Sequence, residues 1–239
     1  LSHELRTPLN AILGYAQLLD REKDPKPLVA NAARTIKRSG EHLAGMIEGL
    51  LEISKIEAGK VEIDRHKVAL RPLLDQIVDM FTLQAQSKGI GFEFNALTGM
   101  PAYVFTDDKR LRQVLINLLS NAVKFTETGK VTFSIAYRND IATITVQDTG
   151  PGIPPEDLER VFLPFERGAP DTSAGMAPGT GLGLTITHLL LDVMGGDLAV
   201  NSEVGQGTTF VVRLMLPSAQ QGEESADTMR PVIGYQGRR

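Results

Sequence analysis

Three polar residues at helical spacing could bind a phosphate group and a metal ion. Asn117, Asn121 and Lys124 lie four and three residues apart in TDDKRLRQVLINLLSNAVKF, so a helix places them on one face. Asparagine is a poor helix former, so its repeated use in one helix needs a reason. An asparagine carbonyl oxygen suits Mg²⁺, which also takes phosphate oxygens and water, and a lysine suits phosphate. A solvated helix face explains this pattern equally well on its own.

An acidic residue followed by glycines could bind a ligand that carries an amino group. In VQDTGPGIPPEDLERVFLPFERG, Asp148 ends a strand pattern, and its carboxylate can accept a hydrogen bond from an exocyclic amine. Gly150 and Gly152 follow, and glycine lets the backbone approach a ligand closely. The sequence therefore predicts a binding turn after this strand.

Glycines also lead into the next helical pattern. In GTGLGLT, Gly179, Gly181 and Gly183 precede a helix, where free backbone N–H groups bind phosphate. The spacing matches neither a Walker loop, which needs Gly-Lys-Ser/Thr, nor the dinucleotide fingerprint. The small residues of APDTSAGMAP, just before this motif, are typical of a lid over a ligand. By itself such a glycine-rich turn indicates little.

The third residue of the chain is a histidine on a polar helix face. His3 lies about 200° around a helix from Leu5, so it faces away from the apolar seam. An exposed imidazole is mostly neutral at pH 7 and keeps a ring nitrogen free to attack an electrophile. Glu4 follows and could hold the other ring nitrogen. Taken alone, a solvated histidine explains this pattern better.

Two helical patterns surround and follow this histidine. Apolar residues from Leu5 to Leu19 alternate at spacings of four and three, the pattern of a helix in a bundle. The prolines and charges of residues 20–27 predict a turn, and a second helix follows from Leu28 to a C-cap near Gly59. A lone antiparallel hairpin leaves its seam in water. We therefore expect a homodimer in which two hairpins form a four-helix bundle.

The periodicity changes after Gly59. Strand patterns such as KVTFSIAYR and IATITVQD alternate with helical ones such as RPLLDQIVDMFTLQAQSKG, which predicts an α+β domain over residues 60–217. Residues 218–239 are polar and carry no apolar period, so they predict a linker or tail. The expected organisation is a hairpin over residues 1–59, the α+β domain and this tail.

The composition excludes several classes of function. The 239 residues carry a net charge of −4, which gives no support for nucleic-acid binding. The chain has no cysteine, which removes thiolate metal sites and favours a reducing, cytoplasmic location. No apolar run approaches the roughly 20 residues that span a bilayer. Because the chain begins with Leu1 in a helical pattern, we expect a sensor domain and any membrane anchor to lie outside it.

Four motifs stand in one order along the chain: SHELRTPL, NLLSNAVKFT, DTGPGIPPEDLERVFLPFERG, and GTGLGLT with VGQGTTF behind it. Together they closely resemble those of the sensor histidine kinases of two-component signalling, from Leu1 to about Pro217. The first glycine motif alone also fits the wider ATPase superfamily that contains gyrase, a large heat-shock chaperone and mismatch-repair proteins. The histidine motif excludes those relatives.

The resemblance implies a dimerisation and phosphotransfer hairpin, followed by an α/β sandwich with a mixed sheet that binds ATP and Mg²⁺. It implies an ATP-dependent autokinase that passes the phosphoryl group to an aspartate of a response-regulator receiver domain. His3 matches the phosphoacceptor and Glu4 the acid that orients it and takes its proton. Thr7 matches the threonine that positions water when such proteins act as phosphatases on the regulator.

The resemblance also assigns the nucleotide site. Asn121 matches the magnesium ligand, and Asp148 matches the carboxylate that accepts from the adenine amino group, supported by Thr209. The other matching positions are Asn117 and Lys124 beside the phosphates, Phe125 near the adenine, Gly150 and Gly152 under the base, Arg167 near the γ-phosphate, and Gly179, Gly181 and Gly183 around the triphosphate.

Two departures from the family pattern are small, since Pro151 and His188 replace an aliphatic and a basic residue without removing a catalytic group. The tail ending RPVIGYQGRR resembles linkers that lead into a receiver domain in hybrid kinases. Two alternatives remain: a scaffold that binds nucleotide without reacting, and an ATP-driven clamp of the gyrase type. The sequence leaves open the stimulus and whether a subunit phosphorylates itself or its partner.

Overall fold

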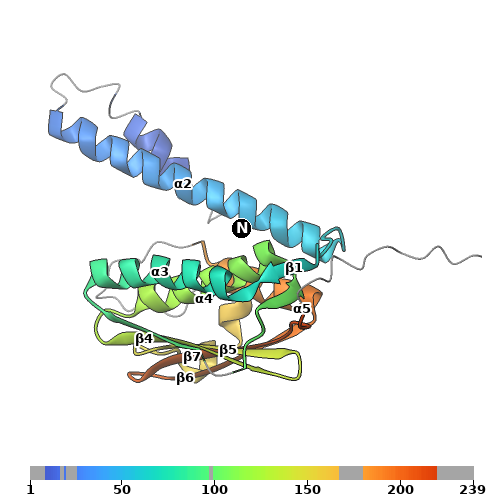
Figure 1. The fold of residues 1–239 in the computed structure, drawn as a ribbon. Coiled ribbons are helices and arrows are strands. Elements are labelled where there is room, and N and C mark those ends of the chain that lie inside the picture. The colour runs from blue at the N-terminus through green and yellow to red at the C-terminus, as the bar shows by residue number, and fades with distance from the viewer. Residues whose placement is uncertain (1–8, 17–18, 20–25, 97–98, 167–179, 220–239) are drawn as a thin grey trace, which may run out of the picture.

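A computed structural model describes residues 9–16, 19, 26–96, 99–166 and 180–219 of the chain. A long helix, α2 (Lys26–Glu57), runs above an α/β domain, and the helical residues 9–16 lie beside it (Figure 1). A Cβ added at Gly40 would lie 4.0 Å from Cδ1 of Ile12, which places the two helical segments in contact. Helix α2 begins at Lys26 rather than after Pro27, because proline is tolerated in the first turn of a helix.

A five-stranded mixed sheet forms the base of the α/β domain. Its strand order is β2-β4-β5-β7-β6; β2 pairs with β4 in parallel and the other pairs are antiparallel. The bounds are Gly91–Ala96 for β2, Lys130–Arg138 for β4, Ile141–Asp148 for β5, Gly196–Glu203 for β6 and Gly207–Met215 for β7. The mixed sheet agrees with the fold class expected from the sequence.

Three helices cover one face of this sheet: α3 (Leu70–Lys88), α4 (Asp108–Phe125) and α5 (Gly183–Met194) (Figure 1). Alternate residues of β4 and β5 point at the helices, so Val131, Phe133 and Ile144 are buried. Leu115 and Leu118 of α4 meet them in the same core. Two short 3₁₀ turns, η1 (Pro155–Asp157) and η2 (Arg160–Phe162), connect β5 toward α5.

A small second sheet lies next to the end of α2. Strand β1 (His66–Ala69) pairs antiparallel with β3 (Tyr103–Thr106). The segment that follows β7 lies alongside β3: Phe105 N donates to Pro217 O at 2.9 Å, and Ala219 N donates to Tyr103 O at 2.9 Å. Backbone pairing with the domain therefore continues two residues beyond Pro217, where the sequence analysis ended it.

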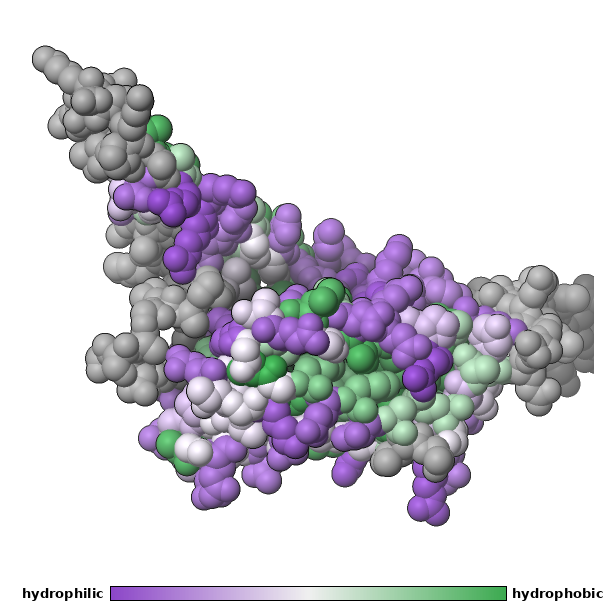
Figure 2. Space-filling model, turned by 60° about the vertical axis from the view of Figure 1, so that its left-hand side comes forward, coloured by the Kyte–Doolittle hydropathy of each residue, from purple (hydrophilic) through white to green (hydrophobic). Residues whose placement is uncertain are grey.

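The face of the molecule in Figure 2 is mainly hydrophilic. On the same face, a band of hydrophobic colour crosses the body of the molecule in the space-filling view (Figure 2). Within the described ranges, no helix combines the length and the apolar character that a membrane crossing requires.

Helix α2 contacts the α/β domain through apolar and polar groups. Ile53 and Ile56 belong to the main apolar core, and a Cβ added at Gly49 would lie 2.7 Å from Cδ1 of Leu182. Glu52 adds a polar clamp, because its two carboxylate oxygens accept from Arg110 Nη1 at 2.5 Å and from Gln113 Nε2 at 2.7 Å. Because Arg110 Nη1 also donates to Gln113 Oε1 at 3.0 Å, the three side chains form a closed network.

We predict that Glu52→Arg separates α2 from the α/β domain, because it places two cations together and leaves Gln113 without its acceptor. Small-angle scattering should then show a larger radius of gyration than for the original protein. Glu48→Arg makes the same charge change at an exposed position of α2 and should leave the radius unchanged. Equal radii for Glu52→Arg and Glu48→Arg would show that the clamp does not hold the two parts together.

Candidate nucleotide site

The carboxylate of Asp148 is buried at the end of β5. The residue is only 7% exposed, and its Oδ1 accepts from Gly150 N at 2.8 Å and from Thr208 N at 3.3 Å. Burial raises the pKa of the Asp148 carboxyl above its ordinary value, and the two N–H donors offset part of the rise. Within the described part of the chain these hydrogen bonds all go to Oδ1, which leaves Oδ2 able to accept from a ligand.

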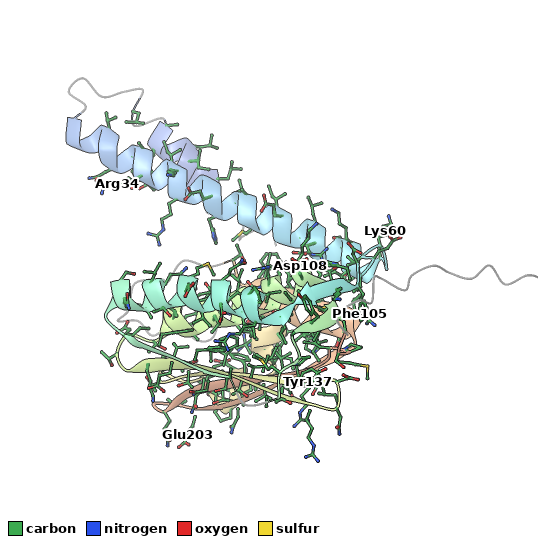
Figure 3. The ribbon with its side chains drawn as sticks, in the orientation of Figure 1. Arg34, Lys60, Phe105, Asp108, Tyr137 and Glu203 are labelled. Atoms are coloured by element: carbon green, nitrogen blue, oxygen red, sulfur yellow. The ribbon has the colours of Figure 1, made fainter. Side chains whose placement is uncertain are left out.

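Glycines let three backbone segments converge around Asp148. Gly207 has φ 112°, and a Cβ there would lie 2.0 Å from the Asp148 carbonyl oxygen. Gly152 has φ 74°, and its added Cβ would lie 2.2 Å from the Glu203 carbonyl oxygen. Glu203 itself ends β6 at the lower edge of the sheet (Figure 3). Gly152 was expected at the site, whereas sequence reasoning missed Gly207, although it lies in the quoted VGQGTTF motif.

The residue that supports Asp148 is Thr208, not Thr209 as the sequence analysis expected. Strand residues alternate between two faces, and Thr208 faces the buried side with 6% exposure. Its backbone N–H contacts the carboxylate, and its hydroxyl shares a 2.9 Å hydrogen bond with Ser202 Oγ. Thr209 instead stands on the other face, in register with Gln147 and Asn201. The expected position was therefore wrong by one residue.

Helix α4 carries the polar stripe, which consists of Asn117, Asn121 and Lys124, and its end lies at this turn. It starts at an N-cap, Asp107, whose side chain accepts from Arg110 N at 3.0 Å, and it ends at Phe125. Because α4 is continuous over this range, Asn117, Asn121 and Lys124 share one face as expected. An added Cβ at Gly150 would lie 3.1 Å from the Phe125 carbonyl oxygen, so the end of α4 abuts the Asp148 turn.

The end of α4 presents a cation and an exposed aromatic ring. Lys124 Nζ lies 4.5 Å from the centroid of the Phe125 ring, and Phe125 is 46% exposed. The Phe125 backbone abuts the Asp148 turn, so an exposed aromatic ring and a buried carboxylate belong to neighbouring segments. Together they could offer a stacking surface and a hydrogen-bond acceptor to a flat heteroaromatic ligand. The nearby ammonium suits an anionic group on the same ligand.

Asn117 links α4 to the start of α5. Its Nδ2 donates to Gly183 O at 3.2 Å and to Thr187 Oγ1 at 3.3 Å. The first turn of α5 has no side-chain cap, so its backbone N–H groups are suited to an anion. Gly181 precedes it with φ 72° and accepts from Phe165 N at 3.0 Å. Sequence reasoning placed Asn117 near phosphates but did not foresee its bonds to α5.

Five expected site residues lie outside the described residues: His3, Glu4, Thr7, Arg167 and Gly179. Their roles stay predictions. The described residues do add Arg160, which the sequence analysis did not single out. Its guanidinium donates to Asp157 Oδ1 at 3.1 Å and to Glu166 Oε2 at 2.8 Å. The second bond ties η2 to Glu166, the residue directly before Arg167. Arg160 and Asp157 are three residues apart, so their contact is local, whereas the contact with Glu166 depends on how the chain after η2 folds.

Two families match separate parts of the chain. Residues 106–218 match the family described as histidine kinase-, DNA gyrase B- and HSP90-like ATPase. Residues 1–59 match the His kinase A (phospho-acceptor) domain. The ATPase match includes α4, the Asp148 turn and α5, and the phospho-acceptor match includes His3.

Curated relatives carry both parts within longer chains. The aerobic respiration control sensor protein ArcB of Escherichia coli strain K12 is 37% identical over 228 residues, which are 95% of this chain and 29% of ArcB. The autoinducer 2 sensor kinase/phosphatase LuxQ of Vibrio parahaemolyticus is 37% identical over 220 residues, 90% of this chain and 25% of LuxQ. The chain thus spans less than a third of either relative.

A solved structure has the same arrangement. Full-length ShkA in complex with AMPPNP superposes with a TM-score of 0.70 at 34% identity, covering 92% of this chain and 46% of ShkA. The superposition includes both the helical part and the α/β domain described above.

We predict that Asp148→Asn raises the thermal unfolding midpoint at pH 7.5. An amide still accepts from Gly150 and Thr208 but carries no buried charge. Because the folded-state pKa is raised, ionisation of Asp148 destabilises the fold as pH rises above the unfolded value near 3.8. The gain should therefore shrink as the pH is lowered toward that value.

Asp197→Asn at an exposed position of β6 is the matched control and should show no pH-dependent gain. A lower midpoint for Asp148→Asn than for the original protein at pH 7.5 would contradict the account of this carboxylate.

Proposed function

Because the chain belongs to the sensor histidine kinases, we propose that it is an ATP-dependent autokinase that phosphorylates His3. The observation that carries the proposal is the buried Asp148 carboxylate, whose Oδ2 is left to accept from a ligand beside the polar stripe of α4. We further propose that residues 1–59 are the phosphotransfer hairpin and that the ATP-binding domain, expected over 60–217, extends to Ala219, which pairs with β3. The residues after it, up to 239, are proposed as a linker toward a receiver domain.

ATP fits the chemistry of the described side chains. The adenine amino group can donate to Oδ2 of Asp148, and the exposed ring of Phe125 can cover the base. Gly150 and Gly152 keep the turn under the base free of side chains. The triphosphate then extends along α4 toward Lys124 and the free N–H groups at the start of α5, with Gly181 and Gly183 leading into that helix.

Asn121 fits a magnesium ion bound together with the phosphates. It is half-buried on the same face of α4 as Lys124. Its side-chain carbonyl oxygen is the type of ligand that Mg²⁺ accepts next to phosphate oxygens and water. When bound, Mg²⁺ offsets negative charge on the phosphates during transfer. Asn117, already bonded to Gly183, would hold the start of α5 against the nucleotide.

In the proposed reaction a ring nitrogen of His3 attacks the γ-phosphorus of ATP in line with the bond to the β-phosphate oxygen. The N–P bond forms as that P–O bond breaks, and ADP leaves with the electron pair. Glu4 orients the imidazole and takes its proton. Lys124, and Arg167 when it reaches the γ-phosphate, stabilise the developing charge. We propose that the α/β domain swings to bring the γ-phosphate to the imidazole, a movement that would require the Glu52 clamp to open or shift.

The phosphoryl group next passes to an aspartate of a receiver domain, either on a separate response regulator or fused downstream. Thr7 would position water for removal of the phosphoryl group from the regulator, a phosphatase activity; LuxQ, a relative, is itself named a kinase/phosphatase.

Exposed apolar side chains on the hairpin support a homodimer. They are Leu9, Leu13, Val29, Ile47 and Leu51.

We predict that the protein becomes labelled when it is incubated with γ-labelled ATP and Mg²⁺, and that His3→Ala removes the label. The label should be lost in acid and kept in base, as expected for a phosphorus–nitrogen bond. His42→Ala, also on the hairpin, is the control and should label like the original protein.

Label on His3→Ala equal to that on the original protein, or label that resists acid, would overturn the assignment. ATP hydrolysis without any label would favour the gyrase-type clamp, and ATP binding without hydrolysis or label would favour the scaffold.

A further inference from the structure

We infer that Lys88 is a positioning residue of the nucleotide site, which it serves by fixing the end of α4 that carries Lys124 and Phe125. This inference rests on the proposed ATP binding. Lys88 lies at the end of α3, in a different element from the residues that face the nucleotide, and none of the sequence motifs contains it.

The local sequence AQSKGI fixes where Lys88 leaves its helix. Gly89 adopts φ 78° and its N–H donates to Gln86 O at 3.1 Å, while Ile90 N donates to Ala85 O at 3.0 Å. This pair of bonds is the Schellman motif, which a glycine permits and an apolar residue after it completes. Ile90 is 6% exposed. Lys88 is therefore held as the last helical residue, and its side chain starts from a defined point.

The ammonium of Lys88 caps the C-terminus of α4. Its Nζ donates to Val123 O at 2.7 Å and to Lys124 O at 2.5 Å. The last carbonyls of a helix have no partner within the helix and carry its negative dipole end, so a cation there is favourable. Thr126 completes the cap, because its N and Oγ1 both bond to Ala122 O, at 3.1 Å and 2.7 Å.

The capped residues are the same ones that the nucleotide would contact. Lys124 offers its carbonyl to Lys88 and its ammonium to the proposed phosphates. The next carbonyl, of Phe125, abuts Gly150 in the Asp148 turn. Helices α3 and α4 lie side by side and run in the same direction, so their C-terminal ends meet (Figure 1). Loosening the end of α4 would therefore shift the phosphate-binding lysine relative to the adenine-binding turn.

Two simpler roles for Lys88 make different predictions. A cap that only stabilises the fold would lower the unfolding temperature and leave ATP affinity unchanged well below that temperature. A lysine that itself binds phosphate would act independently of Lys124, so the effects of removing both would add. A positioning residue acts through Lys124, so its loss should matter little once the Lys124 ammonium is gone.

The experiment is calorimetric titration with Mg-ATP, well below the unfolding temperature of every variant. Lys88→Met, which keeps the stem and removes the ammonium, should weaken ATP binding about tenfold. Lys88→Arg, which keeps a cationic donor, should recover most of the affinity. Lys109→Met, at an exposed position in the first turn of α4, is the control for removal of one lysine charge and should bind like the original protein.

The double variant Lys88→Met/Lys124→Met gives the decisive comparison. Positioning predicts that it binds ATP about as weakly as Lys124→Met alone. Additive losses would instead assign Lys88 a direct phosphate contact, and unchanged affinity in Lys88→Met would reduce it to a structural cap; either result overturns the inference. If the original protein binds no ATP, the proposed function fails first and independently of Lys88.

Discussion

The site depends on a carboxylate that the fold buries before any ligand arrives. Asp148 lies at the end of β5 with two backbone donors on one oxygen, and the pKa of its carboxyl is raised by burial. Keeping a charge there costs stability, and the surrounding chain is built to hold it. Gly207 lets β7 reach the Asp148 backbone, and Gly150 lets the end of α4 reach the same turn. Because both backbone donors go to Oδ1, Oδ2 can accept from a donor on a ligand.

Helix α4 connects that carboxylate to the rest of the molecule. Its first turns are bound by Glu52 of α2, its middle holds α5 through Asn117, and its end is capped by Lys88 of α3. The N-terminal side chains lie near the end of α2, as the position of Asp108 shows (Figure 3). A change at one contact of a rigid helix shifts the others, so α4 is suited to couple nucleotide occupancy to the position of the α/β domain on the hairpin.

Sequence reasoning succeeded where a pattern is local. The spacing of Asn117, Asn121 and Lys124 follows from helical periodicity, and Asp148 with its glycines follows from a strand ending in a turn. It failed where a contact joins distant segments. The choice of Thr208 over Thr209 depends on which face of β7 is buried, and the Lys88 cap depends on α3 and α4 ending together. The alternation of Thr208 with Phe210, Val212 and Leu214 could have indicated the buried face of β7, whereas the Lys88 cap is not encoded in spacing along the chain.

The central claim is that the buried Asp148 carboxyl, whose pKa is raised by burial, accepts a hydrogen bond from adenine. A ¹³C titration of the Asp148 carboxyl, in the free protein and with Mg-ATP, measures this directly. The account predicts a raised pKa in the free protein and a lower one with ATP, since a donor to the charged form favours it. An ordinary pKa in the free protein, or one that ATP leaves unchanged, would contradict the claim.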